Sequence, residues 1–299
     1  MAATVLVTGA SGFVGSHVCT ALAQDGHDVR AMTRHPERYD GAGTPVAGDV
    51  EDRASLDAAL AGTHAAYYFV HSLDSADFED KDAQAARNFG AAAAAAEVRQ
   101  IIYLGGLGAD DENLSPHLRS RREVETLLGE AGVPVTTLRA AVVIGHGGIS
   151  WEITRQLVDH LPAMLTPRWV KTRTQPIALV DVVRYLVGVL DHPDAIGKTF
   201  EVGGPEVLSY LAMLRRAAKV QGKRRLPTVN VPLLSPRLSS AWLALVTDVD
   251  LATARNLVDS MINEVVVHDR SIEKIVPGST LGYDDAVRQA LADRKAAAE

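Results

Sequence analysis

The glycine-rich run that opens the chain constrains the fold more than any other feature of the sequence. Residues Val5–Gly15 read Val-Leu-Val-Thr-Gly-Ala-Ser-Gly-Phe-Val-Gly, and the apolar segment Thr4–Val7 is typical of a buried parallel strand. An amphipathic helix follows directly, because Val14, Val18 and Leu22 fall on one helical face. A strand, a glycine-rich turn and a helix in this order predict a binding site for the pyrophosphate of a dinucleotide.

Each of the three glycines in this run has its own expected role. Gly9 permits the tight turn out of the strand, Gly12 lets backbone N–H groups approach phosphate oxygens, and Gly15 lets the helix lie close to the sheet. The N-terminus of the helix adds partial positive charge at the same place. A glycine triplet between a strand and a helix is far more specific for a nucleotide than an isolated triplet.

Strand-like and helix-like segments alternate along the rest of the first half. The expected strands are Asp28–Thr33, Val46–Val50, Ala65–Val70, Gln100–Leu104 and Val135–Leu138, and the expected helices are Arg53–Leu60, Phe78–Glu97 and Pro116–Gly129. This alternation predicts an α/β fold with a doubly wound parallel sheet of the Rossmann type.

The pattern loosens after Gly145. The expected segments are a helix at Ser150–Leu161, an irregular stretch at Pro162–Gln175, a strand and helix within Pro176–Leu190, a strand at Lys198–Val202, and helices ending at Val220, over Val231–Val246 and over Leu251–Met261. We therefore expect a dinucleotide-binding domain over residues 1–149 and a smaller substrate lobe over 150–299. Residues 176–204 are expected to return to the main sheet.

Composition narrows the classes of partner. The chain has 299 residues and a net charge of −7, which argues against general affinity for nucleic acid or anionic membranes. A basic strip at Arg215, Arg216, Lys219, Lys223, Arg224 and Arg225 is interpreted as a solvated helix end rather than a polyanion site. No leader and no apolar stretch of about 18 residues is recognisable, so we expect a cytoplasmic protein. The segment Val231–Val246 is expected to be an internal helix, the alternative being contact with a membrane surface or partner.

Several motifs in order give the chain a resemblance to a known family. They are Thr8–Gly15, Gly48–Val50, Tyr68–Ser72, Tyr103–Gly106, Leu138–Gly145 and Phe200–Pro205. Together they resemble the short-chain dehydrogenase/reductase superfamily, in its atypical, extended branch of NmrA-like NAD(P)-binding proteins. Three further segments, Leu114–Arg121, Gln175–Ala178 and Leu238–Trp242, resemble a bacterial subgroup named nucleoside-sugar epimerases or NAD(P)-binding proteins.

The end of the second expected strand bears on cofactor choice. It reads Ala-Met-Thr-Arg up to Arg34 and carries no carboxylate for the ribose hydroxyls of NAD. Thr33 can donate a hydrogen bond and Arg34 offers a planar fork suited to a 2′-phosphate, so NADP(H) is favoured over NAD(H). In the alternative interpretation, Arg34 is a solvated residue at the strand end, and His35 or Arg38 shares or replaces its role.

The same resemblance implies the remaining cofactor contacts. Asp49 resembles the acid that contacts adenine in the family, the alternative being a cap of the next helix. The candidate cofactor-binding residues are Gly9, Ser11, Gly12, Phe13, Val14, Gly15, Thr33, Arg34, Asp49, Val50, Val70, His71, Leu104, Gly105, Arg121, Ala141 and Val142. No metal site is expected.

The catalytic positions depart from the family pattern. Ordinary members carry a tyrosine and a lysine four residues apart on the helix after the fifth strand, where this chain has His117 and Arg121. Gly105 and Gly106 occupy the region of the usual serine. His71, at the end of the fourth strand, is a further candidate for contact with nicotinamide or substrate.

Two interpretations stay open. In the first, His117 has a pKa near neutrality and relays a proton as hydride reaches a carbonyl, with Arg121 holding the ribose or an oxyanion. In the second, the dinucleotide is bound and never turned over, as in redox-sensing regulators and an accessory subunit of respiratory complex I. Trp151, Trp169 and Trp242 fit an apolar substrate cavity for an isoprenoid or aromatic compound, or core packing. The expected substrate of the reductase is an apolar quinone or carbonyl compound.

Overall fold

A parallel sheet of seven strands organises the molecule. The computed structural model describes residues 2–72, 75, 77–108, 114–160, 164–166, 168–223, 228–230, 240 and 246–298. The strands stand in the order β11-β6-β5-β4-β1-β2-β3, and every neighbouring pair is parallel. Their bounds are β1 (Thr4–Val7), β2 (Asp28–Thr33), β3 (Thr44–Ala47), β4 (Ala65–Tyr68), β5 (Gln100–Gly106), β6 (Val135–Ala140) and β11 (Thr199–Val202).

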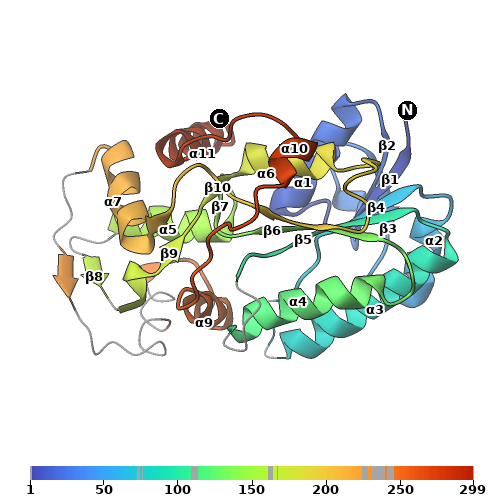
Figure 1. The fold of residues 1–299 in the computed structure, drawn as a ribbon, viewed down its shortest axis with the longest axis horizontal. Helices are drawn as coiled ribbons and strands as arrows, with labels where there is room; N and C mark the ends of the chain where they lie inside the picture. The colour runs from blue at the N-terminus through green and yellow to red at the C-terminus, as the bar shows by residue number, and fades with distance from the viewer. Residues whose placement is uncertain are drawn as a thin grey trace.

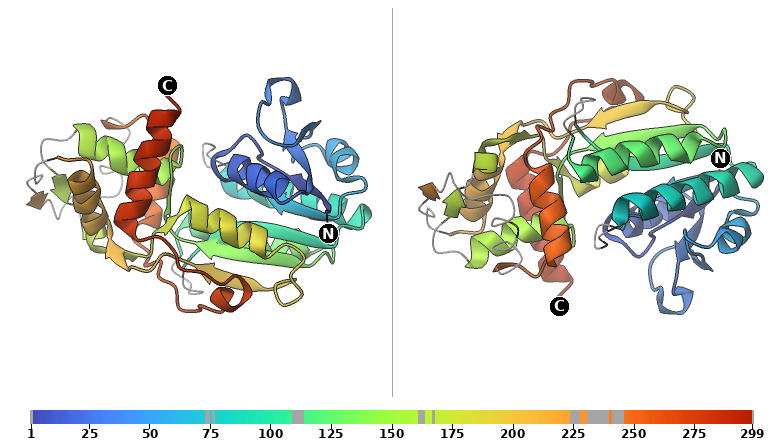
Figure 2. Two further views of the ribbon diagram at one scale, coloured as in Figure 1. Left: turned by 90° about the horizontal axis from the view of Figure 1, so that it is seen from above. Right: turned by 90° about the horizontal axis from the view of Figure 1, so that it is seen from below.

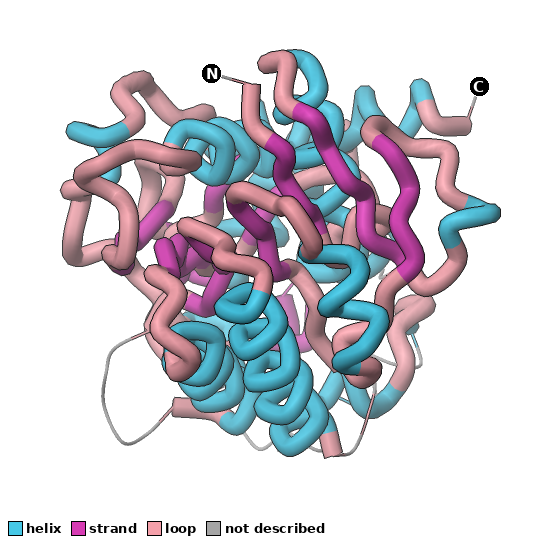
Figure 3. The backbone as a smooth tube through the Cα atoms, turned by 90° about the vertical axis from the view of Figure 1, so that its right-hand side faces the viewer, coloured by secondary structure: helices cyan, strands magenta, loops and turns pink. Residues whose placement is uncertain are grey.

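Helices cover both faces of this sheet, so each face has its own apolar core. One face packs against α1 (Phe13–Gln24) and α6 (Leu179–Gly188), with Val18, Leu22 and Val182 buried between them and the strands. The other face packs against α2 (Arg53–Leu60), α3 (Phe78–Ala95) and α4 (Pro116–Gly129). Figures 2 and 3 show the strands between these two helical layers. The predicted α/β fold with a doubly wound sheet is confirmed.

The second half of the chain adds a lobe that carries α5 (Ile149–His160) and α7 (Tyr210–Val220), at the left of Figure 1. Its other helices are α9 (Leu251–Ser260) and α11 (Tyr283–Ala296), with the short 3-10 turn η2 (Arg168–Lys171). Helix α10 (Ile272–Ile275) packs instead against β11 and the core of the main sheet. Its short strands pair as β7 (Val143–Ile144) with β10 (Ile177–Ala178), β9 (Arg173–Thr174) with β12 (Leu208–Ser209), and β8 (Met164–Thr166) with β13 (Thr228–Asn230).

The chain returns from the lobe to the sheet through β10, α6 and β11, and β11 pairs with β6. The division of the chain at residue 149 stays a prediction. Most of the expected helix Val231–Val246 lies outside the described residues. No helix in the described ranges is both long and apolar enough to cross a membrane.

Some expected boundaries were wrong for identifiable reasons. Strand β3 begins at Thr44 and includes Pro45, because β3 is the edge strand, where a missing N–H costs no ladder bond. Another 3-10 turn, η1 (Pro36–Arg38), connects β2 to β3. Helix α3 ends at Ala95 because Glu97 takes a positive φ of 56° that ends helical geometry.

Strand β5 continues two residues beyond its expected end at Leu104. Gly105 and Gly106 pair in register with Arg139 and Ala140 of β6. Glycine normally indicates a turn, but a Cβ on Gly106 would lie 2.8 Å from Cδ2 of Leu118 on α4. The two glycines therefore keep this central strand bare where a helix approaches it closely.

Candidate functional site

The glycine-rich loop between β1 and α1 has the geometry of a phosphate cradle. Gly9 adopts a φ of 59°, a left-handed conformation that disfavours other residues. A Cβ on Gly12 would lie 3.0 Å from the carbonyl oxygen of Gly9, and one on Gly15 only 2.2 Å from the same oxygen. No side chain caps the N-terminus of α1. The bare loop and uncapped helix fit the pyrophosphate of a dinucleotide.

An open groove, here called the outer cavity, runs from this loop across the ends of β2 and β4. It has a volume of about 650 Å³ and is lined by polar side chains that include Ser11, Thr33, Arg34 and Lys81. Arg34 is exposed and makes no hydrogen bond or ion pair with another described residue. An uncompensated guanidinium at this position is suited to an anionic group in the groove.

Asp49 lines the same groove and does not cap the next helix. The cap of α2 is Asp52, whose carboxylate accepts a hydrogen bond from the backbone N–H of Ala54. One carboxylate oxygen of Asp49 accepts from the N–H of Glu51 at 3.0 Å. The alternative role of Asp49 as a helix cap is therefore wrong.

A second space, the middle cavity, adjoins the outer one at Gly9, Gly12, Phe69 and His71. Its volume is about 310 Å³. Together the two cavities trace the carboxyl ends of β1 and β4, where the strand order reverses. Ligands of open α/β sheets bind at this topological switch point.

The structure gathers the predicted cofactor residues around these two spaces. Ser11, Thr33, Arg34, Asp49, Val50 and Val70 line the outer cavity, Phe13, Val14, Gly15, Leu104, Gly105, Arg121 and Ala141 line the middle cavity, and Gly9, Gly12 and His71 line both. Val142 is the exception. It borders a third space, the inner cavity, which lies beyond His117.

The two candidate histidines and Arg121 meet in the middle cavity. Burial, the charge of Arg121 and the neighbouring His71 lower the pKa of His117 to about 3. Desolvation within the cleft and the charge of Arg121 also lower the pKa of His71, although its side chain is exposed. The expectation of a near-neutral pKa for His117 is therefore wrong. Both imidazoles are neutral at physiological pH, beside one permanent positive charge.

The ring of His117 also has an unsatisfied polar atom. Its Nδ1 is buried and has no hydrogen-bond partner among the described residues. A buried unpaired nitrogen costs free energy unless a ligand or water pairs with it. The middle cavity thus offers a ligand the imidazoles of His71 and His117 and the guanidinium of Arg121.

Sequence reasoning missed Asp82, which lies under this site. Its side chain is buried on α3, and its carboxylate accepts from the backbone N–H of Ser72 at 2.9 Å and from the hydroxyl of Ser120 at 3.4 Å. Burial raises the pKa of Asp82, while the charge of Arg121 opposes that rise. Asp82 therefore connects the segment that carries His71 with the helix that carries Arg121.

Neither tyrosine near this point replaces the one absent from α4. Tyr68 and Tyr103 are buried in the core and line none of the three cavities. The hydroxyl of Tyr103 donates to the backbone oxygen of Arg121 at 3.4 Å. Trp151 is also fully buried in the lobe core, so it packs there and does not line the cleft, whereas the side chains of Trp169 and Trp242 lie outside the described residues.

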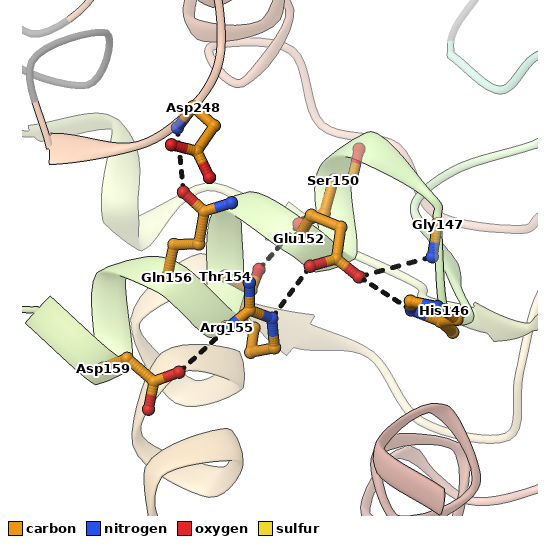
Figure 4. Close-up of polar contacts among 9 residues, drawn as sticks. All are labelled: His146, Gly147, Ser150, Glu152, Thr154, Arg155, Gln156, Asp159 and Asp248. Atoms are coloured by element: carbon orange, nitrogen blue, oxygen red, sulfur yellow. Dashed lines mark hydrogen bonds and ion pairs between the residues drawn. The ribbon is translucent and has the colours of Figure 1, made fainter. Parts of the chain in front are cut away.

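A buried polar network fixes the loop that closes the middle cavity (Figure 4). Glu152 accepts from the N–H of Gly147 at 3.3 Å, lies 3.3 Å from Nδ1 of His146, and receives Nε of Arg155 at 2.8 Å. Arg155 also donates to Asp159 at 2.9 Å. These bonds anchor the first turn of α5, where Ser150 lines the middle and inner cavities.

The hydroxyl of Ser150 is available to a ligand. It makes no hydrogen bond with another described residue, and Figure 4 shows it directed away from the Glu152 network. The backbone oxygen of Ser150 accepts the hydroxyl of Thr154 at 2.9 Å, as in an ordinary helix turn. Ser150 was not predicted, because a serine at a helix start is more often a cap than a binding group.

The expected solvated basic strip is largely neutralised within the lobe. Arg216 pairs with Glu206 at 2.5 Å and with Asp284 at 2.7 Å, and Lys223 pairs with Asp159 at 3.2 Å. Arg224 and Arg225 lie outside the described residues. The described part of the strip is therefore not a free cationic surface.

Comparisons with known proteins agree with this site. A family model described as NAD(P)H-binding matches residues 9–193. The chain is 30% identical over 231 residues to the (4-alkanoyl-5-oxo-2,5-dihydrofuran-3-yl)methyl phosphate reductase of Streptomyces griseus, covering 73% of this chain and 74% of that protein. It is 26% identical to the mitochondrial NADH dehydrogenase (ubiquinone) 1 alpha subcomplex subunit 9 of Arabidopsis thaliana, covering 68% of this chain and 54% of that protein.

A solved structure extends the likeness to the whole fold. The NADPH-dependent quinone oxidoreductase of Escherichia coli, complexed with NADPH, has a TM-score of 0.78 at 20% sequence identity and covers 96% of this chain and 99% of that chain. The fold is thus that of an NAD(P)H-binding, reductase-like protein with reductases among its relatives. The chain belongs to the NAD(P)H-binding family that the matching family model describes.

Proposed function

We propose that the protein is an NADP(H)-dependent reductase that passes hydride to a conjugated carbonyl compound such as a quinone. The observation that carries this proposal is the pairing of Arg121 with the neutral His117 in the middle cavity, beside the phosphate cradle. When bound, a reduced nicotinamide supplies the hydride. The side chains of the cleft supply binding, orientation and charge stabilisation.

The choice of NADP(H) rests on Arg34. Its exposed guanidinium stands unpaired at the carboxyl end of β2 and suits a 2′-phosphate. Asp49 and Val50 line the groove where the adenine is expected, and the bare loop at Gly9–Gly15 receives the pyrophosphate. Residues 150–299 form the substrate lobe in this proposal.

The charge state of His117 and Arg121 favours a hydride acceptor that does not need a strong acid to protonate its oxygen. His117 is neutral, so it donates a hydrogen bond to an oxygen but is not an imidazolium acid. Arg121 balances negative charge that grows on that oxygen. A reduced quinone resembles a phenol, with a pKa of about 10, whereas a simple alcohol is a far weaker acid. A quinone therefore accepts hydride without a strong acid, and water supplies the proton.

The test is oxidation of NADPH by a panel of quinones, conjugated ketones and simple ketones. We expect turnover with the first two classes and little with the third. Arg121→Met should lower kcat by about 10²–10³-fold, the usual effect of removing an oxyanion-stabilising donor. Arg119→Met is the matched control, because Arg119 is an exposed arginine of the same helix that pairs with Glu79 at 3.4 Å. Tight NADPH binding without oxidation by any member would contradict the enzymatic proposal.

The second candidate is a protein that binds NADP(H) and does not turn it over. The observation that favours it is the lining of the middle cavity, where the described residues include neither tyrosine nor lysine. The likeness to a subunit named for mitochondrial NADH dehydrogenase supports the same idea, although this chain covers 54% of that relative. A dinucleotide that stays bound through purification, in a protein inactive toward the whole panel, would favour this role.

A further inference from the structure

We propose that the inner cavity beyond His117 is a subsite for a short, unbranched aliphatic substituent of the acceptor. This inference rests on the proposed function, because it places the reacting oxygen between His117 and Ser150. The subsite contacts the substituent of the acceptor, which lies outside the cofactor cleft. The inner cavity shares Gly106, His117, Ala141, Ser150 and Leu257 with the middle cavity, so the two spaces join at the reacting end.

The walls of the inner cavity come from the carboxyl ends of β5 and β6 and from the four helices α4, α5, α7 and α9. Leu107 and Leu118 bound it on the side of β5 and α4, and Met213 of α7 bounds it opposite. Leu257 of α9 and Met261 just beyond it complete the far side. Leu107, Leu118 and Met213 are each at most 7% exposed, so this part of the wall is buried and apolar. Two methionines in one wall also let it adapt to the shape of a chain.

Apart from His117 and Ser150, which the inner cavity shares with the middle cavity, the polar side chains that line it interact with other groups. The hydroxyl of Thr154 donates to the backbone oxygen of Ser150 at 2.9 Å, and that of Ser260 donates to the backbone oxygen of Asn256 at 2.8 Å. Burial raises the pKa of Tyr210, so its phenol is neutral. None of the described residues that line the space is an aspartate, glutamate, lysine or arginine. The subsite therefore excludes a charged or strongly hydrated substituent.

The size of the cavity limits the substituent. Its volume is about 110 Å³. An apolar cavity of about 150 Å³ in another protein binds benzene, so this one is too small for an aromatic ring. At roughly 30 Å³ for a water-sized group, it holds a chain of about four carbons. Acceptors with longer chains must leave carbons outside or displace the wall.

The experiment uses 2-alkyl-1,4-benzoquinones from methyl to heptyl. Their affinity for the NADP⁺-saturated protein is measured by calorimetry, and their kcat/KM is measured with NADPH. Each buried methylene contributes about 0.8 kcal/mol, so we expect about a fourfold gain per carbon until about butyl, and no gain beyond it. Met261→Ala should move this limit to longer chains, and Met213→Ala serves the same purpose if the first variant does not fold.

The matched control is Leu251→Ala, because Leu251 lies on the same helix as Leu257 but is 44% exposed and does not line the cavity. Its chain-length limit should equal that of the unaltered protein. A limit in affinity that moves with Met261→Ala, without NADPH oxidation, would support the subsite and refute the reductase. Oxidation with no dependence on chain length would overturn the subsite alone. So would a chain-length limit that neither methionine variant changes from that of the unaltered protein.

Discussion

Replacing Arg34 by alanine tests how the protein distinguishes NADPH from NADH. The guanidinium is exposed and has no partner among the described residues, so its removal should leave the folded structure intact. Only the 2′-phosphate separates the two cofactors. The variant should therefore lose affinity for NADPH and keep its affinity for NADH.

The size of this loss follows from the exposure of the site. Hydrogen bonds to charged groups contribute about 1.5–3 kcal/mol, and screening in an open groove favours the lower part of that range. A loss of about 1.5–2 kcal/mol weakens NADPH binding about 10- to 30-fold. Arg34→Lys keeps the charge but not the planar fork, so it should lose less.

Equilibrium fluorescence titration with NADPH and NADH on each variant measures this difference. Arg99→Ala is the matched control. Arg99 is an exposed arginine that directly precedes β5, at the amino ends of the strands, whereas Arg34 lies at their carboxyl ends. Equal weakening of both cofactors by Arg34→Ala would refute the assignment, because the effect would then act on the part they share. Unchanged binding of NADPH would mean that His35 or Lys81, which line the same groove, reads the phosphate.

Three further predictions follow from the same site. Gly15→Ala places a methyl group 2.2 Å from the carbonyl oxygen of Gly9, so it should weaken the binding of every dinucleotide more than about tenfold. Gly26→Ala is the control: Gly26 lies in open space at a φ of 83°, so the change should cost about 1 kcal/mol of stability and leave dinucleotide affinity unchanged. Burial lowers the pKa of His117 in the folded protein to about 3, whereas the histidine of the unfolded chain is protonated below about pH 6.5. The unfolded state therefore binds more protons between these values, and the free energy of unfolding decreases as pH falls. Urea unfolding between pH 6 and 4 should show the natural protein losing up to about 1.4 kcal/mol per pH unit more than His117→Gln, and equal slopes would contradict this. Asp82→Ala leaves two buried donors unpaired and should destabilise the protein by about 1–3 kcal/mol in the same assay, with Asp82→Asn less affected.

The central sheet was largely predictable because its strands and helices carry strong local signals. Strands Thr4–Val7 and Asp28–Thr33 and the helix Pro116–Gly129 have the bounds expected from apolar runs and turn residues. Boundaries failed where tertiary position overrides local preference. Pro45 is tolerated because its strand lies at the sheet edge, a fact that no local window contains.

The lobe was less predictable, because its elements are short and its core comes from distant segments. Helix α11 was not expected, since its sequence is rich in charged residues and Tyr283, Val287 and Ala290 become buried only against α7 and the β7 region. The candidate site was likewise predictable only in part. The glycine cradle and Arg34 were recognisable in the sequence, whereas Asp82 and Ser150 acquire their roles only when remote elements meet.

The bare end of β5 also restricts how this cleft can change. A side chain on Gly106 would push against the Leu118 methyl group that bounds the inner cavity. Any larger residue at Gly106 would therefore need a smaller residue at Leu118, or it would reduce the volume of the inner cavity.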